Sequence, residues 1–202
     1  MNKPIFITGI GTDIGKTIVS AVLVEKLQAD YWKPVQAGDL DNSDTIKVQR
    51  LISNPRSVFH PEAYRLTQPF SPHKAAALDG VEIDINKIIL PQTSNQLIIE
   101  GAGGLMVPLN DTHYIIDLIK HLDAEVILVS RNYLGSINHT LLSIDALTNR
   151  GIPIKAIVIN GNTDEYSEQA IAAYTKNAVP IYYVPGMDEI TKESIFKAAS
   201  SL

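Results

Sequence analysis

The residues with the clearest chemical meaning lie near the N-terminus, where Gly-Lys-Thr closes a loop bracketed by glycines. An apolar run over residues 5–7 precedes the loop, and residues 18–27 have a helical pattern. Backbone N–H groups of such a loop and of the following helix converge on an anion, and the helix dipole favours it. We therefore predict a phosphate-binding loop, in which Lys16 reaches the β- and γ-phosphates of a nucleotide and the Thr17 hydroxyl binds Mg²⁺.

The spacing of this loop departs from the standard phosphate-binding motif, G-x-x-x-x-G-K-[ST]. Gly9 and Gly15 enclose five residues, and Gly11 and Gly15 enclose three. An ordinary glycine-rich turn between a strand and a helix is the alternative. The preceding strand and the Gly-Lys-Thr at the helix start favour phosphate binding.

A carboxylate follows a second apolar run, at residues 96–99. Glu100 ends this predicted strand, and Gly-Ala-Gly-Gly occupies residues 101–104. In a protein with a phosphate-binding loop, this is the usual place for an acid that organises Mg²⁺, and glycines let the backbone approach a ligand closely. The alternative is a sharp turn with an incidental acid.

The sequence leaves the roles of Lys33 and Asp44 open. Residues 31–35 are predicted as a strand, and Pro34 favours an extended Lys33, whose ammonium group either points into a ligand crevice or is merely solvated. Asp44 precedes a helix predicted over residues 45–52. It either serves a ligand or caps that helix and compensates its dipole.

Two further helix starts carry polar residues. Asn138 falls in the first turn of a helix expected over about 137–149, where free N–H groups can bind a carboxylate. Capping by Ser136 is the plainer alternative. Ser71 and Pro72 start another helix, so His73 is predicted to be a first-turn residue rather than a metal ligand.

Short apolar runs alternate with helical patterns along the chain. This predicts an α/β fold of the P-loop NTPase type, with a mostly parallel central sheet flanked by helices on both faces. Further strands are expected at residues 126–129, 154–159 and 181–184, and helices over 164–176 and 190–202. The length favours one domain over residues 1–202.

Composition narrows the class of protein. Apolar residues make up 45% and charged residues 19%, the formal net charge is −5, and there is no basic block, so we expect no nucleic-acid partner. No apolar run has the length of a membrane span, and a core strand follows Met-Asn-Lys-Pro without room for a signal peptide. We therefore expect a cytoplasmic protein with no membrane partner. The absence of cysteine excludes disulfides, thiolate metal sites and a cysteine nucleophile.

Motifs spread along nearly the whole chain resemble dethiobiotin synthetase. The loop Gly9 to Thr17 has that family's longer spacing. The other matching motifs, in the family's order, are Lys33-Pro34-Val35, Asn42-Ser43-Asp44, Ser71-Pro72-His73, Glu100-Gly101-Ala102-Gly103-Gly104, Leu134-Gly135-Ser136-Ile137-Asn138-His139 and Asn160.

The resemblance implies an enzyme of biotin biosynthesis that converts 7,8-diaminopelargonic acid (7,8-diaminononanoate), CO₂ or bicarbonate, and ATP into dethiobiotin, ADP and phosphate. An amine captures CO₂ as a carbamate, the carbamate takes the γ-phosphoryl group to give a carbamic–phosphoric anhydride, and the second amine displaces phosphate to close the ring. It also implies Mg²⁺ as cofactor, ATP as co-substrate, and a homodimer with the active site at the interface.

The resemblance assigns residues to each role. Catalytic roles fall to Lys33, Lys16 and Thr12. The Mg²⁺ ligands are Thr17, Asp44 and Glu100. The nucleotide-binding residues are Asp13, Ile14, Gly15, Lys16, Thr17, Ile18, Asp44, Glu100, Gly101, Ala102, Gly103, Asn160 and Pro185, of which Asn160 reads the adenine. The substrate-binding residues are Thr12, Lys33, Gly38, Gly103 and Asn138.

The chain departs from the family pattern in three places. Ala37 replaces a serine that contacts substrate, so that contact is lost or passes to the backbone at Gly38. Asp13 stands where glutamate is frequent. Tyr182 to Gly186 replaces a Gly-Glu-Ile-Pro-aromatic pattern along the base, which leaves the base selectivity open.

Two other functions share the expected fold. One is a partner-regulated ATPase switch of the chromosome-partitioning kind, whose loop carries an additional lysine; residues 9–14 contain none. The other is a small-molecule kinase, which would release a stable phosphorylated product without needing CO₂. A switch hydrolyses ATP alone, whereas the synthetase needs the diamine.

Overall fold

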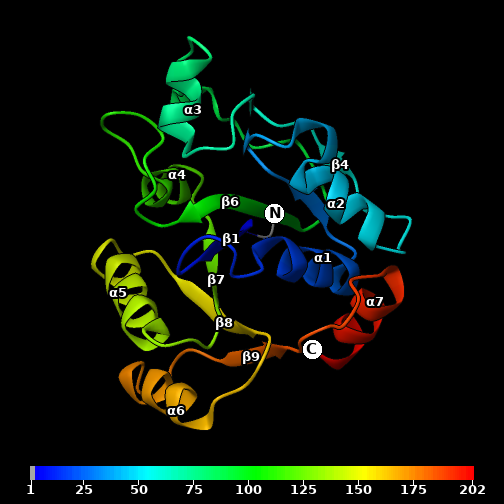
Figure 1. Ribbon diagram of the computed structural model, residues 1–202, viewed down its shortest axis with the longest axis vertical. Coiled ribbons are helices and arrows are strands. Elements are labelled where there is room, and N and C mark those ends of the chain that lie inside the picture. The colour runs from blue at the N-terminus through cyan, green and yellow to red at the C-terminus, as the bar shows by residue number, and fades with distance from the viewer. Residues whose placement is uncertain (1–2) are drawn as a thin grey trace.

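A seven-stranded parallel sheet forms the centre of the computed structural model, which describes residues 3–202 (Figure 1). Its strand order is β4-β2-β6-β1-β7-β8-β9. The strands are β1 (Ile5–Gly9), β2 (Asp30–Trp32), β4 (Phe59–His60), β6 (Leu97–Gly104), β7 (Glu125–Ser130), β8 (Ile154–Asn160) and β9 (Ile181–Val184). A separate pair, β3 (Val35–Ala37) and β5 (Tyr64–Leu66), is also parallel. The predicted α/β class with a mostly parallel sheet is confirmed.

Helices cover both faces of the sheet (Figure 1). They are α1 (Lys16–Leu27), α2 (Asp44–Leu51), α3 (Pro72–Leu78), α4 (Ile115–His121), α5 (Ser136–Asn149), α6 (Glu165–Tyr174) and α7 (Lys192–Ser201), with 3₁₀ turns η1 (Leu40–Asn42) and η2 (Ile85–Lys87). Successive side chains of a strand point to opposite faces. Ile5 and Ile7 of β1 therefore join the core under α1, α2 and α7, whereas Phe6 joins the core under α4, α5 and α6.

Two strands end differently from their predictions. The strand expected over 31–35 is interrupted at Lys33 and Pro34: β2 ends at Trp32, and Val35 begins β3 in the second sheet. The strand expected to end at Glu100 runs on as β6 to Gly104, which pairs with Gly9. A Cβ at Gly104 would lie 3.2 Å from the Gly9 carbonyl oxygen, so glycine permits this close approach. The sharp-turn alternative at Glu100 is wrong.

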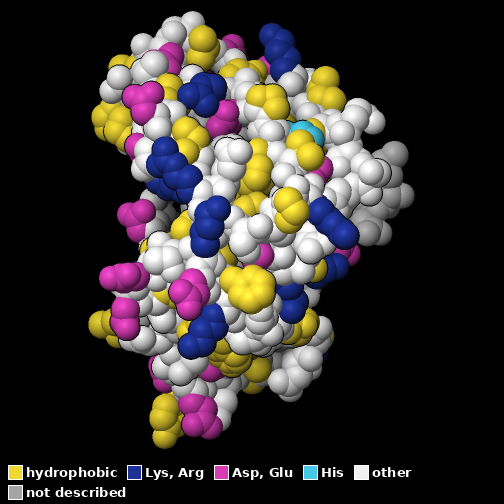
Figure 2. Space-filling view, turned by 90° about the vertical axis from the view of Figure 1, so that its right-hand side faces the viewer, with side chains coloured by type: hydrophobic (Ala, Val, Ile, Leu, Met, Phe, Trp, Pro, Cys, Tyr) yellow, Lys and Arg dark blue, Asp and Glu magenta, His cyan; other side chains and the backbone are white. Residues whose placement is uncertain are grey.

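Helix α4 was not predicted, although its sequence carries a helical signal. Residues 115, 116, 118 and 119 are buried, at the spacing typical of a helix that packs one face on a core. Among the helices of residues 3–202, none is long and apolar enough to cross a membrane. Figure 2 shows basic and acidic side chains interspersed over the face that carries α2 and α7.

Candidate functional site

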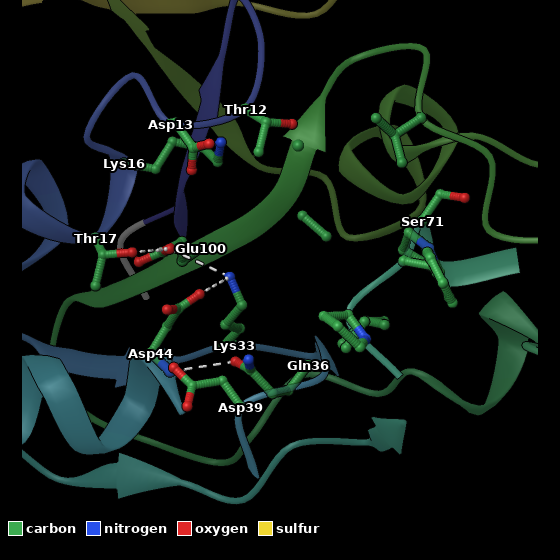
Figure 3. Close-up of a pocket in the computed structure, with 18 of the residues that line it drawn as sticks. Thr12, Asp13, Lys16, Thr17, Lys33, Gln36, Asp39, Asp44, Ser71 and Glu100 are labelled. Atoms are coloured by element: carbon green, nitrogen blue, oxygen red, sulfur yellow. Dashed lines mark hydrogen bonds and ion pairs between the residues drawn. The ribbon is translucent and has the colours of Figure 1, made fainter. Parts of the chain in front are cut away.

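A cavity of about 810 Å³ lies where the carboxyl ends of β1 and β6 meet the starts of α1 and α2 (Figure 3). Ligands of parallel α/β sheets bind at this edge. The cavity brings together ten residues that the sequence singled out. They are Thr12, Asp13, Gly15, Lys16, Thr17, Lys33, Asp44, Glu100, Ala102 and Gly103.

The loop between β1 and α1 forms a hydrogen bond with the side chain of Lys16, the residue that follows it. Gly15 has φ +92°, which favours glycine, and α1 starts at the next residue. The Lys16 ammonium donates to the Gly11 carbonyl at 2.9 Å and is buried. Burial lowers the pKa of Lys16 to about 8, although Glu100 acts in the opposite direction. The loop therefore holds a desolvated cation where an anion can approach it.

Lys33 links two carboxylates beside this loop (Figure 3). Its Nζ lies 2.7 Å from Asp44 Oδ2 and 3.2 Å from Glu100 Oε1. Thr17 donates its hydroxyl to the same Glu100 oxygen at 2.8 Å. Lys33 is 4% exposed and Glu100 1%. Burial opposes the charge on Lys33, but the two carboxylates outweigh it and raise its pKa, so the side chain stays an ammonium ion.

Local structure explains why Lys33 and Asp44 face each other. Lys33 leaves the sheet at the break between β2 and β3. Ser43 is the N-cap of α2 and accepts from the Ile46 N–H at 3.4 Å. The capping role that the sequence left open for Asp44 therefore belongs to Ser43, and the Asp44 carboxylate pairs with Lys33. Burial opposes this charge, but Lys33 and Lys47 lower the Asp44 pKa.

Comparison with known proteins decides the family. A family model described as an AAA domain matches residues 3–194. An ATP-dependent dethiobiotin synthetase of Cytophaga hutchinsonii is 53% identical over 201 residues, covering 99% of this chain and 97% of the relative. A synthetase of the same name from Christiangramia forsetii is 58% identical over 171 residues, covering 85% and 82%. The chain belongs to the dethiobiotin synthetase family. The family expected from the motifs is thereby confirmed.

Solved structures with the same fold are more distant. A MinC:MinD cell division complex of Aquifex aeolicus matches with a TM-score of 0.60 at 15% identity, covering 99% of this chain and 95% of that one. A ParA family ATPase of Chlorobium tepidum matches with a TM-score of 0.58 at 15% identity, covering 98% and 90%. At this identity the likeness shows the fold alone. It does not favour the ATPase switch over dethiobiotin synthesis.

Gln36 is a cavity residue of this synthetase that the sequence reasoning missed. Its side-chain amide donates to the Gly38 carbonyl at 2.9 Å and accepts from the Asp44 N–H at 3.2 Å. The Gly38 N–H donates to the Leu66 carbonyl at 2.8 Å. Both backbone groups of Gly38 are thus engaged, and Ala37 rather than Gly38 lines the cavity. The only sequence signal for Gln36 was its place directly after Lys-Pro-Val.

Seven residues assigned from the family resemblance lie outside the cavity lining. They are Ile14, Ile18, Gly38, Gly101, Asn138, Asn160 at the end of β8, and Pro185. The side-chain amide of Asn160 donates to the Ile14 carbonyl at 2.9 Å, so it contacts the loop between β1 and α1. Asn138 is exposed in the first turn of α5, whose N-cap is Gly135 rather than Ser136. Pro185 is exposed after β9.

The donor set around Lys33 suits a hard cation. Thr17, Asp44 and Glu100 offer one hydroxyl and two carboxylates, and Mg²⁺ is usually bound by one or two carboxylates together with substrate phosphates. Within residues 3–202, no group of three or more His, Cys, Asp or Glu side chains forms a metal cage. The site therefore fits Mg²⁺ that arrives with a nucleotide.

Proposed function

We propose that the chain catalyses the ATP-dependent closure of 7,8-diaminopelargonic acid and CO₂ to dethiobiotin, releasing ADP and phosphate. One observation carries the proposal. The phosphate-loop residues Lys16 and Thr17 share a cavity with the buried Lys33–Asp44–Glu100 cluster. Family membership supports the same reaction, in biotin biosynthesis.

The reaction needs cations more than it needs a nucleophile from the protein. An amine nitrogen attacks CO₂ and loses a proton to give a carbamate. A carbamate oxygen attacks the γ-phosphorus, and ADP leaves. The second amine then attacks the carbamoyl carbon, and phosphate leaves as the ring closes. The carbamate and the phosphoryl group are both anionic, so preorganised positive charge lowers the barriers.

Two lysines of the cavity have a proposed place in this reaction sequence. Lys16 neutralises the β- and γ-phosphates. Lys33 stabilises the carbamate and the transferring phosphoryl group, since its ammonium is held by carboxylates at the cavity wall. Thr12 and Gly103 are proposed to contact the substrate and the phosphates. The two residues are neighbours, because a Cβ at Gly103 would lie 3.7 Å from the Thr12 hydroxyl.

We propose that the cofactor is Mg²⁺, held by Thr17, Asp44 and Glu100. When bound there it would neutralise phosphate charge and orient the γ-phosphoryl group. Thr17 already contacts Glu100, and both acids already hold a cationic group, Lys33. The adenine is proposed to lie toward Asn160 and Pro185, with ATP as the expected nucleotide.

The enzyme is proposed to be a homodimer with a site shared between subunits. Asn138 is exposed outside the cavity, and its helix also exposes Ile137 and Leu142. Leu134, just before the helix, is fully exposed. Exposed apolar side chains of this kind mark interaction surfaces, and two-fold dimers are the commonest oligomers. The partner's helix would then bring its N-terminal N–H groups to the substrate carboxylate.

Residues 1–202 are proposed to act as one domain in the cytoplasm, where ATP is available. Support for one domain comes from the sheet, because β1 lies at its centre, β9 lies at its edge, and α7 packs on α1.

Product analysis tests the function. Purified protein is incubated with MgATP, bicarbonate and the diamine, and products are identified by mass spectrometry. Dethiobiotin and ADP are expected in equal amounts, with no ADP formed when the diamine is omitted. ATP hydrolysis without the diamine would indicate a switch. A stable phosphorylated product formed without bicarbonate would indicate a kinase.

A further inference from the structure

Tyr31 is a fully buried tyrosine whose hydroxyl the proposed reaction does not use. It lies in β2, opposite Ile98 of β6, and its ring contacts Phe59 with centroids 5.8 Å apart. A buried tyrosine usually keeps a hydrogen-bond partner for its hydroxyl. Here that partner is a carboxylate of the candidate site, because Tyr31 donates to Glu100 Oε2 at 2.9 Å.

The two oxygens of Glu100 have different partners. Oε1 accepts from Thr17 at 2.8 Å and from Lys33 at 3.2 Å, on the cavity side. Oε2 accepts from Tyr31, and Glu100 is 1% exposed, so water cannot easily replace that donor. The phenol therefore fixes the rotation of the carboxylate and keeps Oε1 directed at Thr17 and Lys33.

We propose that Tyr31 is a positioning residue for Mg²⁺ binding, which acts by holding Glu100 Oε2 so that Oε1 meets the metal. This inference rests on the proposed metal site. Groups that hydrogen-bond to a metal-binding carboxylate orient it, and their removal typically costs about 10- to 100-fold in metal affinity or activity.

The test measures metal binding directly. Tyr31→Phe removes only the hydroxyl. Mn²⁺, a cation that carboxylates also bind, is titrated by electron paramagnetic resonance in the presence of a non-hydrolysable ATP analogue. We expect Tyr31→Phe to bind Mn²⁺ at least about tenfold more weakly than the wild type. The Mg²⁺ concentration for half-maximal turnover rises by a similar factor, while kcat at saturating Mg²⁺ recovers.

Tyr64→Phe is the matched control. Tyr64 is partly buried, lies in β5, and accepts from the Asp84 N–H at 3.0 Å outside the cavity. Its loss should lower the thermal midpoint without changing Mn²⁺ affinity. Wild-type Mn²⁺ affinity in Tyr31→Phe, whatever its thermal midpoint, would overturn the proposal and leave the hydroxyl a packing role.

A double-mutant cycle covers the case in which Tyr31→Phe alone folds poorly. In Tyr31→Phe the buried Glu100 carboxylate loses one of its hydrogen-bond donors. Combining this change with Glu100→Gln removes that buried charge. If Tyr31 acts through Glu100, the tyrosine change adds no further loss of Mn²⁺ affinity in that background. Additive losses would overturn the proposal. Because the binding assay needs no turnover, a wild type that makes no dethiobiotin would refute the proposed function and leave this comparison intact.

Discussion

The Lys33 ammonium lies 2.7 Å from Asp44 Oδ2, so the proposed catalytic cation is paired with a proposed metal ligand. Glu100 contacts the same ammonium at 3.2 Å. The positive charge of Lys33 and the proposed binding of Mg²⁺ are therefore coupled through two shared carboxylates. Changing any one of these three side chains alters the electrostatic surroundings of the other two.

Lys33→Ala should lower kcat at least about 100-fold, the scale of losing one group that stabilises a developing anion. ATP affinity should change much less, since Lys33 lies outside the phosphate loop. Steady-state kinetics and equilibrium binding of an ATP analogue measure the two effects. Lys155→Ala, which breaks a surface pair with Glu125, is the control. Equal losses in rate and in nucleotide affinity would assign Lys33 to phosphate anchoring instead.

Asp44→Asn and Glu100→Gln should each raise the Mg²⁺ concentration for half-maximal activity. Both changes keep the size of the side chain and remove the charge that attracts a hard cation. Asp39→Asn is the control, because Asp39 lines the same cavity but pairs with Lys47 at 2.7 Å. A Mg²⁺ titration like that of the wild type would show that the residue is not a metal ligand.

Ala37→Ser should lower KM for the diamine about 3- to 10-fold, the value of one hydrogen bond. Ala37 lines the cavity, whereas Gly38 does not, and its N–H is already bonded to the Leu66 carbonyl. The KM for ATP should stay constant and serves as the internal control. An unchanged KM for the diamine would mean that the substrate does not reach this wall.

Two inactive variants should complement each other if subunits share the site. Lys16→Gln and Asn138→Leu are mixed and allowed to exchange. Random exchange gives about half mixed dimers, each with one intact site of two, so about a quarter of wild-type activity should return. Subunit exchange is verified separately with tagged chains. No recovery after verified exchange would place Lys16 and Asn138 of each site on one chain.

Glu25→Gln should destabilise the fold without touching the site. Burial opposes the Glu25 charge, but donors from Ser53 and Asn54, including Ser53 N–H at 2.7 Å, lower its pKa. A carboxyl group whose pKa is lower in the folded than in the unfolded state stabilises the fold at pH values above its unfolded pKa. This stabilisation is lost as the pH falls through the folded pKa. Urea unfolding should show a loss of roughly 2 kcal/mol near neutral pH that shrinks in acid. The exposed Glu82→Gln is the control; a pH-independent loss would contradict the assignment.

The phosphate loop, six of the seven strands of the main sheet and the family were predictable from the sequence, because contiguous residues carry each of these signals. The short strands β4 and β5 were not predicted. Gly15, Lys16 and Thr17 follow one another, and the start of a helix presents them together. Helix α4 was missed although its apolar spacing was visible. The break between β2 and β3 was missed because the preference of Lys33 for extended backbone did not reveal which sheet the next residues would join.

The sequence by itself predicted candidate side chains for the chemistry, and the tertiary structure decided which of them touch. The sequence left Asp44 open between capping and serving a ligand; in the structure Ser43 is the cap and Lys33 pairs with Asp44. Tyr31 had no sequence signal, because its contact with Glu100 spans 69 residues and depends on the register of β2 against β6. Hydrogen bonds are short-ranged, so a register shift of one residue would remove this one. Local spacing cannot encode such pairings; they arise only when the strands assemble.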